Sequence, residues 1–195
     1  FNTISEWLSL NSNLLIGATW ETIYMVAVAG IVGFAVGIPL GVILHTTKKG
    51  GLLENTKLNS ILGAVVNVGR SVPFLVLMVA IIPVTKILVG TFIGTTAAIV
   101  PLTIGAIPFV ARLIEGALLE VPTGLVEAAQ SMGATPMQII NKVLLPEAMP
   151  TIVNSVTITL VTLVSYSAMA GTVGGGGLGD VAIRYGFHRY DVVIM

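Results

Sequence analysis

The segment that decides the fold is EAAQSMGATPMQIINKVLLP, residues 127–146, because it is polar and stands between two strongly apolar segments. Thr135, Pro136 and Gln138 follow the order of an N-cap, a first helical residue and the closing residue of a capping box. Gly133, just before them, suits the left-handed position that follows a helix end. We therefore predict two short helices joined at Gly133, which project from the chain as a rigid docking element.

The prolines around this segment predict where the two helices begin and end. Pro122 suits the first turn of a helix, so the first helix is predicted over 123–132. Pro146 lacks a backbone N–H, and we expect it to end the second helix. The whole polar insert is expected over about 115–148.

The composition indicates a membrane protein. Hydrophobic residues make up 55% of the 195 residues and charged residues only 9%, against roughly a quarter charged in soluble domains. Nine Lys and Arg balance nine Asp and Glu, so no basic excess points to nucleic acid. The chain has no cysteine and hence no disulfide or Cys-based metal site. The length fits a single membrane domain, 1–195, so any ATP chemistry is expected in another chain.

Four apolar segments are long enough to cross a membrane as helices. A helix rises ~1.5 Å per residue, so ~20 apolar residues cross a hydrocarbon core of ~30 Å. A further apolar run begins at the end of the chain, at 191–195, and predicts a truncated fifth span. The fold class is therefore an all-α integral membrane protein, with complete spans at about 20–44, 58–83, 91–110 and 151–170.

The basic residues indicate which ends of these spans face the cytoplasm. The loop over 45–57 contains three lysines, and the insert region contributes Arg112 and Lys142. Only three basic residues lie on the opposite side. Because cytoplasmic loops are enriched in Lys and Arg, the insert is predicted to be cytoplasmic.

Polar residues recur on one face of the fourth span. At ~100° per residue, spacings of four and three keep them within one narrow stripe. Such a stripe is predicted to line a water-filled path or another helix, because lipid offers hydroxyl groups no partner. Alternatively, Ser and Thr bond to their own backbone and the stripe packs against a helix. The stripe consists of Ser155, Thr159, Thr162, Tyr166 and Met169.

Arg70 lies near the middle of the second predicted span, three residues before Pro73. A lone Arg at this depth costs at least ~2.5 kcal/mol on insertion scales, so it needs a partner or a cavity. Asn67, one turn earlier, and carbonyls freed by Pro73 are candidate partners. Two interpretations remain open, a structural tether and a role in the transport path.

Glycines also recur in the first span, at Gly33, Gly37 and Gly41. Their four-residue spacing leaves a smooth groove into which another helix can pack closely. The groove is interpreted either as ordinary packing within the chain or as a contact at a pore or dimer seam.

Other motifs are weaker. The pattern GxGxxG at 174–179 follows a membrane helix rather than a strand, so a nucleotide site is not expected there. We expect it to form a flexible outer turn or a re-entrant loop. His45 and His188 lack partners at metal-ligand spacing, so no metal site is expected. No Ser-His-acid set or carboxylate pair can be assembled, so the chain is not expected to be an enzyme.

The opening segment resembles the cytoplasmic signature of type I ABC importer permeases. That signature is Glu-Ala-Ala, three residues, Gly, nine residues, then Ile-x-Leu-Pro. The only departure here is Val in place of Ile. The matching residues are Glu127-Ala128-Ala129, Gly133 and Val143-Leu144-Leu145-Pro146.

Three further segments are similar to the methionine importer permeases within that family. They are RSVPF at 70–74, MGATPMQI at 132–139, and YSAM at 166–169 followed by the glycine tract. This closer resemblance extends from about Trp20 to the end of the chain. Members of this family have five spans, which implies that the final helix is truncated here.

The resemblance implies a permease subunit in a bacterial inner membrane, surrounded by lipid, that carries L-methionine and, as a further candidate, D-methionine. It implies a homodimer, two ATPase subunits that bind ATP and Mg, and an extracytoplasmic substrate-binding lipoprotein. The transport path would include Arg70 and the polar stripe of the fourth span. The residues implied to couple to the ATPase are Glu127, Ala128, Ala129, Gly133, Ala134, Thr135, Pro136 and Met137.

Two alternatives to this function remain. The same importer mechanism could serve another amino acid or a small polar solute. An ATP-independent channel would also account for Arg70 and the polar stripe, but it would not need a cytoplasmic docking element.

Overall fold

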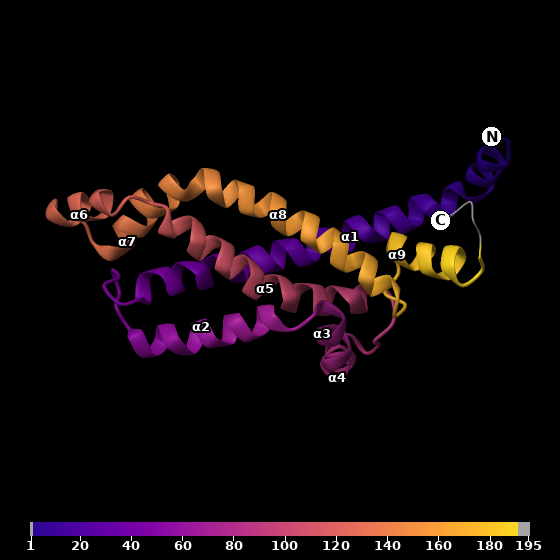
Figure 1. Ribbon diagram of the computed structural model, residues 1–195, viewed down its shortest axis with the longest axis horizontal. Helices are drawn as coiled ribbons and strands as arrows, with labels where there is room; N and C mark the ends of the chain where they lie inside the picture. Colours follow the sequence, from indigo (N-terminus) through magenta and orange to yellow (C-terminus); the bar gives the residue numbers. More distant parts are fainter. Residues whose placement is uncertain (1, 191–195) are drawn as a thin grey trace. The chain divides into compact units, whose positions relative to one another are not determined.

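The computed structural model describes the backbone of residues 2–190 and the side chains from residue 12 onward. The fifth span predicted at 191–195 lies outside the described residues. Every described element is helical (Figure 1). The elements are α1 (Asn2–Thr47), α2 (Thr56–Ser71), α3 (Phe74–Ala80), α4 (Ile82–Val89), α5 (Thr95–Leu119), α6 (Thr123–Ser131), α7 (Pro136–Ile139), the π-helical turn η1 (Ile140–Leu144), α8 (Leu145–Gly171), α9 (Gly177–Val181) and the π-helical turn η2 (Ala182–Phe187).

Among the described residues, three stretches of helix are long and apolar enough to cross a membrane: Ser12–Thr47, Thr95–Leu119 and Pro136–Gly171. The fourth candidate is the pair formed by α2 and α3, which bends by 103° at its break. The span predicted over 58–83 is therefore a broken helix rather than a continuous one, and it remains a candidate fourth span. Pro73 explains the break, because it lacks an N–H and disfavours helical geometry in the preceding residue.

The other boundaries also differ from the predicted ones. α5 begins later than the span predicted at 91–110 and continues to Leu119, into the predicted insert. The prediction that Pro146 ends the second insert helix is wrong, because one helical stretch runs from Pro136 to Gly171. The π-helical turn η1 precedes Pro146. In this turn the backbone hydrogen bonds span five residues, as from the N–H of Leu145 to the carbonyl of Ile140, and the wider turn accommodates the proline ring.

The chain divides into two compact units. Unit 1 contains the described residues of Phe1–Ile31, Val72–Gly105 and Leu160–Met195, and unit 2 contains Val32–Ser71 and Ala106–Thr159. Within unit 2, apolar side chains from α5, α6, α7, η1 and α8 form one core. Its buried residues are Val110, Ile114, Ala117, Leu118, Val121, Ala129, Ile139, Ile140, Leu144, Ala148 and Ile152.

The glycine stripe of α1 packs directly against α5 inside unit 2. A Cβ atom at Gly37 would lie 2.6 Å from Cβ of Val110, and one at Gly41 would lie 2.6 Å from the carbonyl oxygen of Ala111. Real Cβ atoms do not approach this closely, so only glycine allows the two helices to meet here. The interpretation of the stripe as packing within the chain is confirmed.

In unit 1 the glycine tract is closely packed. A Cβ atom at Gly171 would lie 2.2 Å from the backbone nitrogen of Asp180, so the end of α8 and the helix α9 meet backbone to backbone. The N–H of Gly177, the first residue of α9, donates to Oε2 of Glu21 on α1 at 2.7 Å. The tract is thus a tight turn held against α1, and the expectation of a flexible turn is wrong.

We expect Gly37→Ala to destabilise the protein, because the added methyl group would overlap Val110. Overpacking of this kind costs about 1–3 kcal/mol and should lower the unfolding midpoint in detergent by about 2–10 °C. The matched control is Gly17→Ala in the same helix, where a Cβ atom meets nothing within 4 Å. Equal unfolding midpoints for the two variants would contradict the packing role of the stripe.

Candidate functional site

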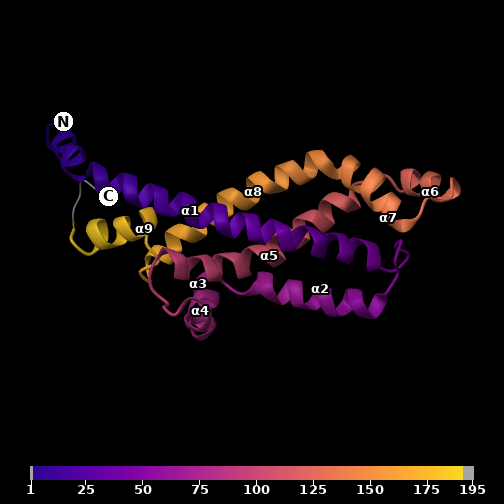
Figure 2. The ribbon, with the colours of Figure 1, turned by 180° about the vertical axis from the view of Figure 1, so that it is seen from behind.

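The predicted turn between the two short helices of the insert is confirmed. α6 ends at Ser131, and Gly133 then adopts the left-handed conformation with φ of +79°. The N–H of Gly133 donates to the carbonyl of Gln130 at 2.9 Å, which closes the turn. Both ribbon views place α6 and α7 at the end of unit 2 where α5 ends and the long helix of α8 begins (Figures 1 and 2).

The start of the second insert helix is also as predicted. The backbone N–H of Thr135 donates to Oε1 of Gln138 at 2.9 Å, and the N–H of Gln138 donates to Oγ1 of Thr135 at 3.4 Å. This reciprocal pair is a capping box, with Pro136 at the first helical position. The two short helices are therefore held by local bonds on either side of Gly133.

The insert has one face buried in unit 2 and one exposed face. Ala129 and Ile139 are buried and belong to the core of unit 2. Glu127 and Ala128 are exposed, as are Gly133, Thr135 and Pro136, whereas Ala134 is half-buried. Met132 is 82% exposed and Met137 63% exposed. The insert thus offers two flexible apolar side chains to its surroundings while its inner face holds it in place.

A polar cavity lies beside the insert within unit 2. It has a volume of about 230 Å³, and α6 and the turn after α1 contribute to its lining. Glu127 from α6 and Lys48 from the turn both line it, as does His45 at the end of α1. The carboxylate of Glu127 therefore lies on a surface shared by the insert and a basic turn.

The polar stripe of α8 is divided between the two units. In unit 2, Ser155 and Thr159 are buried and donate to backbone carbonyls four residues earlier, at 2.9 and 2.8 Å. These two residues therefore follow the alternative in which hydroxyl groups bond to their own helix. Thr162, Tyr166 and Met169 belong to unit 1, where Met169 is 40% exposed.

Tyr166 has an aromatic partner that the sequence did not indicate. Its ring stacks on Phe74, with centroids 4.4 Å apart and an angle of 7° between the ring planes. Phe74 is the first residue of α3, directly after the break at Pro73. The break therefore allows α3 to present an aromatic ring to the stripe of α8 within unit 1.

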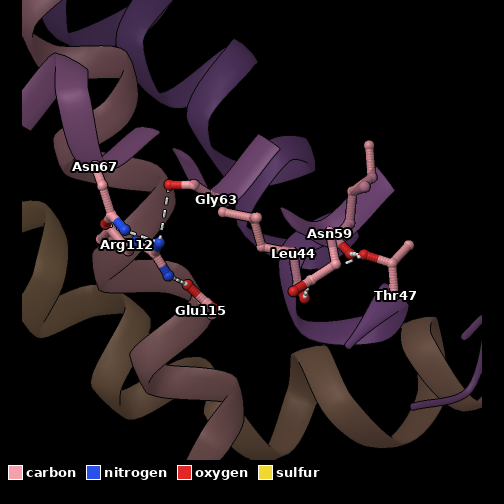
Figure 3. Close-up of polar contacts among 8 residues, drawn as sticks. Leu44, Thr47, Asn59, Gly63, Asn67, Arg112 and Glu115 are labelled. Atoms are coloured by element: carbon pink, nitrogen blue, oxygen red, sulfur yellow. Dashed lines mark hydrogen bonds and ion pairs between the residues drawn. The ribbon is translucent and has the colours of Figure 1, made fainter. Parts of the chain in front are cut away.

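Arg70 is exposed in the last turn of α2, and it forms none of the hydrogen bonds found among the described residues. Neither candidate partner named from the sequence, Asn67 or a carbonyl near Pro73, is bonded to Arg70. Oδ1 of Asn67 instead accepts from Nη2 of Arg112 at 2.8 Å (Figure 3). Arg112 also pairs with Glu115, three residues further along α5. Sequence spacing gave no signal for the bond between Asn67 and Arg112, which are 45 residues apart.

The chain matches a known transport family over most of its length. Residues 37–188 match the family described as binding-protein-dependent transport system inner membrane component. The matched range contains the whole insert and both halves of the polar stripe.

Individual proteins show the same similarity. The chain is 86% identical over 195 residues to the probable D-methionine transport system permease protein MetI of Vibrio cholerae, covering 100% of this chain and 87% of the relative. It is 58% identical over 158 residues to the D-methionine transport system permease protein MetI of Escherichia coli K12, covering 81% of this chain and 73% of the relative.

A solved structure has the same fold. It describes inward-facing conformations of the MetNI methionine ABC transporter, and one of its chains superposes with a TM-score of 0.93 at 55% sequence identity. The match covers 95% of this chain and 86% of that chain.

We expect Thr135→Ala to loosen the second insert helix without unfolding the protein. Loss of an N-cap side chain costs about 1 kcal/mol, so backbone amides near the start of α7 should exchange about fivefold faster with deuterated water. Thr135→Ser keeps the hydroxyl group and should exchange like the unmodified chain. Unchanged exchange in the alanine variant would show that the cap does not hold the insert.

Proposed function

Because this chain belongs to the family of binding-protein-dependent transport system inner membrane components, we propose that it forms the transmembrane path of an ATP-driven methionine importer. It is a multi-pass protein of the inner membrane. The observation that carries the proposal is 86% identity along the entire chain to a protein named as a probable D-methionine transport system permease. The substrate is methionine, with the L- and D-enantiomers both candidates.

The importer would contain several chains besides this one. Two ATPase subunits bind ATP and Mg and hydrolyse the nucleotide, a second copy of this chain completes the membrane path, and a binding lipoprotein delivers substrate from outside. The similarity to a chain of the MetNI methionine ABC transporter supports this assembly. In this arrangement the chain forms the membrane path and changes conformation during transport, and catalysis takes place on the ATPase.

The insert is the proposed docking element for the ATPase. Its inner face is anchored by Ala129 and Ile139, so a force applied to the insert is transmitted to unit 2. Its exposed face presents Met132 and Met137, whose flexible thioether side chains adapt well to a partner's groove. Glu127, Ala128, Gly133, Ala134, Thr135 and Pro136 complete the coupling surface.

The continuous helical stretch from Pro136 to Gly171 supports a lever mechanism. Closure of the ATPase subunits on ATP would displace the insert. A helix without a break carries that displacement along its length, and the same stretch contains the whole polar stripe. Movement of this kind converts nucleotide-driven closure into alternation between outward and inward openings.

Arg70 and the polar stripe are the proposed path residues. Thr162, Tyr166 and Met169 would contact the substrate. The half-buried ring of Tyr166, which stacks on the buried ring of Phe74, supplies an apolar surface suited to a thioether side chain. Ser155 and Thr159 would support the lining of the path without contacting the substrate, since both are buried and bonded to their own helix.

The direct test is uptake into proteoliposomes that contain the full transporter, meaning this chain, its ATPase and its binding protein. We expect ATP-dependent uptake of labelled methionine that needs all three components and is suppressed by excess L- or D-methionine alone. Suppression by a different amino acid or solute would keep the importer mechanism and replace the substrate. Uptake without ATP or partners would instead indicate a channel and refute the proposal.

Substitutions at Gly133 test the docking role of the insert. Gly133→Pro should abolish co-purification of the ATPase, because proline cannot adopt φ of +79° and lacks the N–H that closes the turn. Gly133→Ala should weaken it, since a left-handed alanine costs roughly 1–2 kcal/mol. The matched control is Gly124→Ala, where a Cβ atom also meets nothing within 4 Å and φ is not positive. Normal ATPase binding by Gly133→Pro, with membrane insertion intact, would refute the assignment.

A further inference from the structure

In the part of the chain that the structure describes, the polar contacts of α2 with its neighbours in unit 2 lie on one face of the helix. Asn59, Gly63 and Asn67 recur every fourth residue along this face (Figure 3). The side-chain amide of Asn59 donates to the carbonyl of Leu44 at 2.6 Å and to Oγ1 of Thr47 at 3.1 Å. The first turn of α2 is therefore bonded to the end of α1.

Arg112 binds the same face of α2 from α5. Its Nη2 donates to the carbonyl of Gly63 at 3.2 Å and to Oδ1 of Asn67 at 2.8 Å. Its Nη1 pairs with Glu115, which neutralises the guanidinium charge. The side chains of Arg112 and Glu115 are only 24% and 15% exposed. The planar guanidinium of Arg112 donates to all three acceptors at once. A lysine ammonium could not donate to the same three acceptors with this geometry.

The remaining contacts of α2 with α5 and with the end of α1 are apolar and non-directional. They include Gly69 of α2 against Pro108 of α5. They also include a cluster of Val66 of α2, Leu44 of α1 and Ala111 of α5. In lipid, apolar contacts between helices have no hydrophobic driving force, because lipid tails are as apolar as the side chains. Directional bonds to Arg112 therefore set the register of α2 on α5.

This register matters because of what each helix is joined to. α5 ends at Leu119, immediately before the insert. α2 ends at Ser71, immediately before the break and the helix α3 that carries Phe74. We propose that Arg112 is a positioning residue for energy coupling, which holds α2 to α5 so that α2 moves with the insert-bearing helix during transport. This inference rests on the proposed importer function.

The test measures methionine taken up per ATP hydrolysed by the complete transporter in proteoliposomes. The main variant is Arg112→Met with Glu115→Gln, which removes the bonds to α2 without leaving a buried charge. The second variant is Asn67→Ala, which keeps the ion pair and removes one bond to α2. We expect ATPase assembly and ATP hydrolysis to persist while uptake per ATP falls about fivefold or more in the first variant, the low end of measured coupling effects, and less in the second.

An engineered disulfide between α2 and α5 tests whether restoring the link between these helices restores coupling. This chain has no cysteine, so an engineered pair meets no competing thiol from the same chain. A Cβ atom at Gly69 would lie 3.2 Å from Cβ of Pro108, close to the spacing of about 3.5–4.5 Å in disulfides. Adding Gly69→Cys and Pro108→Cys to the main variant should restore uptake per ATP when oxidised but not when reduced. The same cysteine pair with Arg112 and Glu115 intact should be well coupled when reduced.

The outcomes distinguish failure of the proposed importer function from failure of the role proposed for Arg112. If the unmodified transporter shows no ATP-driven methionine uptake, the proposed function fails and the role of Arg112 fails with it. If the unmodified transporter works but uptake and ATP hydrolysis fall in proportion in both variants, Arg112 has only a structural role. Failure of the oxidised pair to restore coupling would likewise overturn the proposal.

Discussion

The close approach of α1 and α5 is the contact on which unit 2 depends. Lipid removes the hydrophobic advantage of burying large apolar side chains between helices, so association relies on close van der Waals contact. Gly33, Gly37 and Gly41 provide that contact by leaving no side chain between the two backbones. α5 in turn presents Val110 and Ile114 to the core that holds the insert. The position of the docking element therefore depends on three glycines of α1.

Local rules accounted for the parts of the fold that depend on neighbouring residues. The turn at Gly133 and the capping box of Thr135 and Gln138 were predicted correctly, because each involves residues within four positions of one another. The helix end predicted at Pro146 was wrong because a π-helical turn before this residue accommodates its ring. No composition rule indicates such a turn. The bend after α2 is signalled by Pro73, but its size of 103° depends on packing.

The polar contacts of the candidate site were the hardest to foresee. The sequence showed that an arginine within a span needs a partner, yet it did not show that Asn67 would bind Arg112 rather than Arg70. The stack of Tyr166 on Phe74 likewise joins residues that are far apart in the chain. Periodicity identified the stripe on α8 but not that Ser155 and Thr159 would bond to their own backbone. Such outcomes depend on which helices become neighbours.

The bond between Glu21 and Gly177 has a consequence for how the protein is made. The two residues are 156 positions apart, and Glu21 lies within the first membrane-crossing helix. During synthesis this carboxylate is made long before the amide that it binds. The contact that holds the start of α9 against α1 can therefore form only after Gly177 has been synthesised.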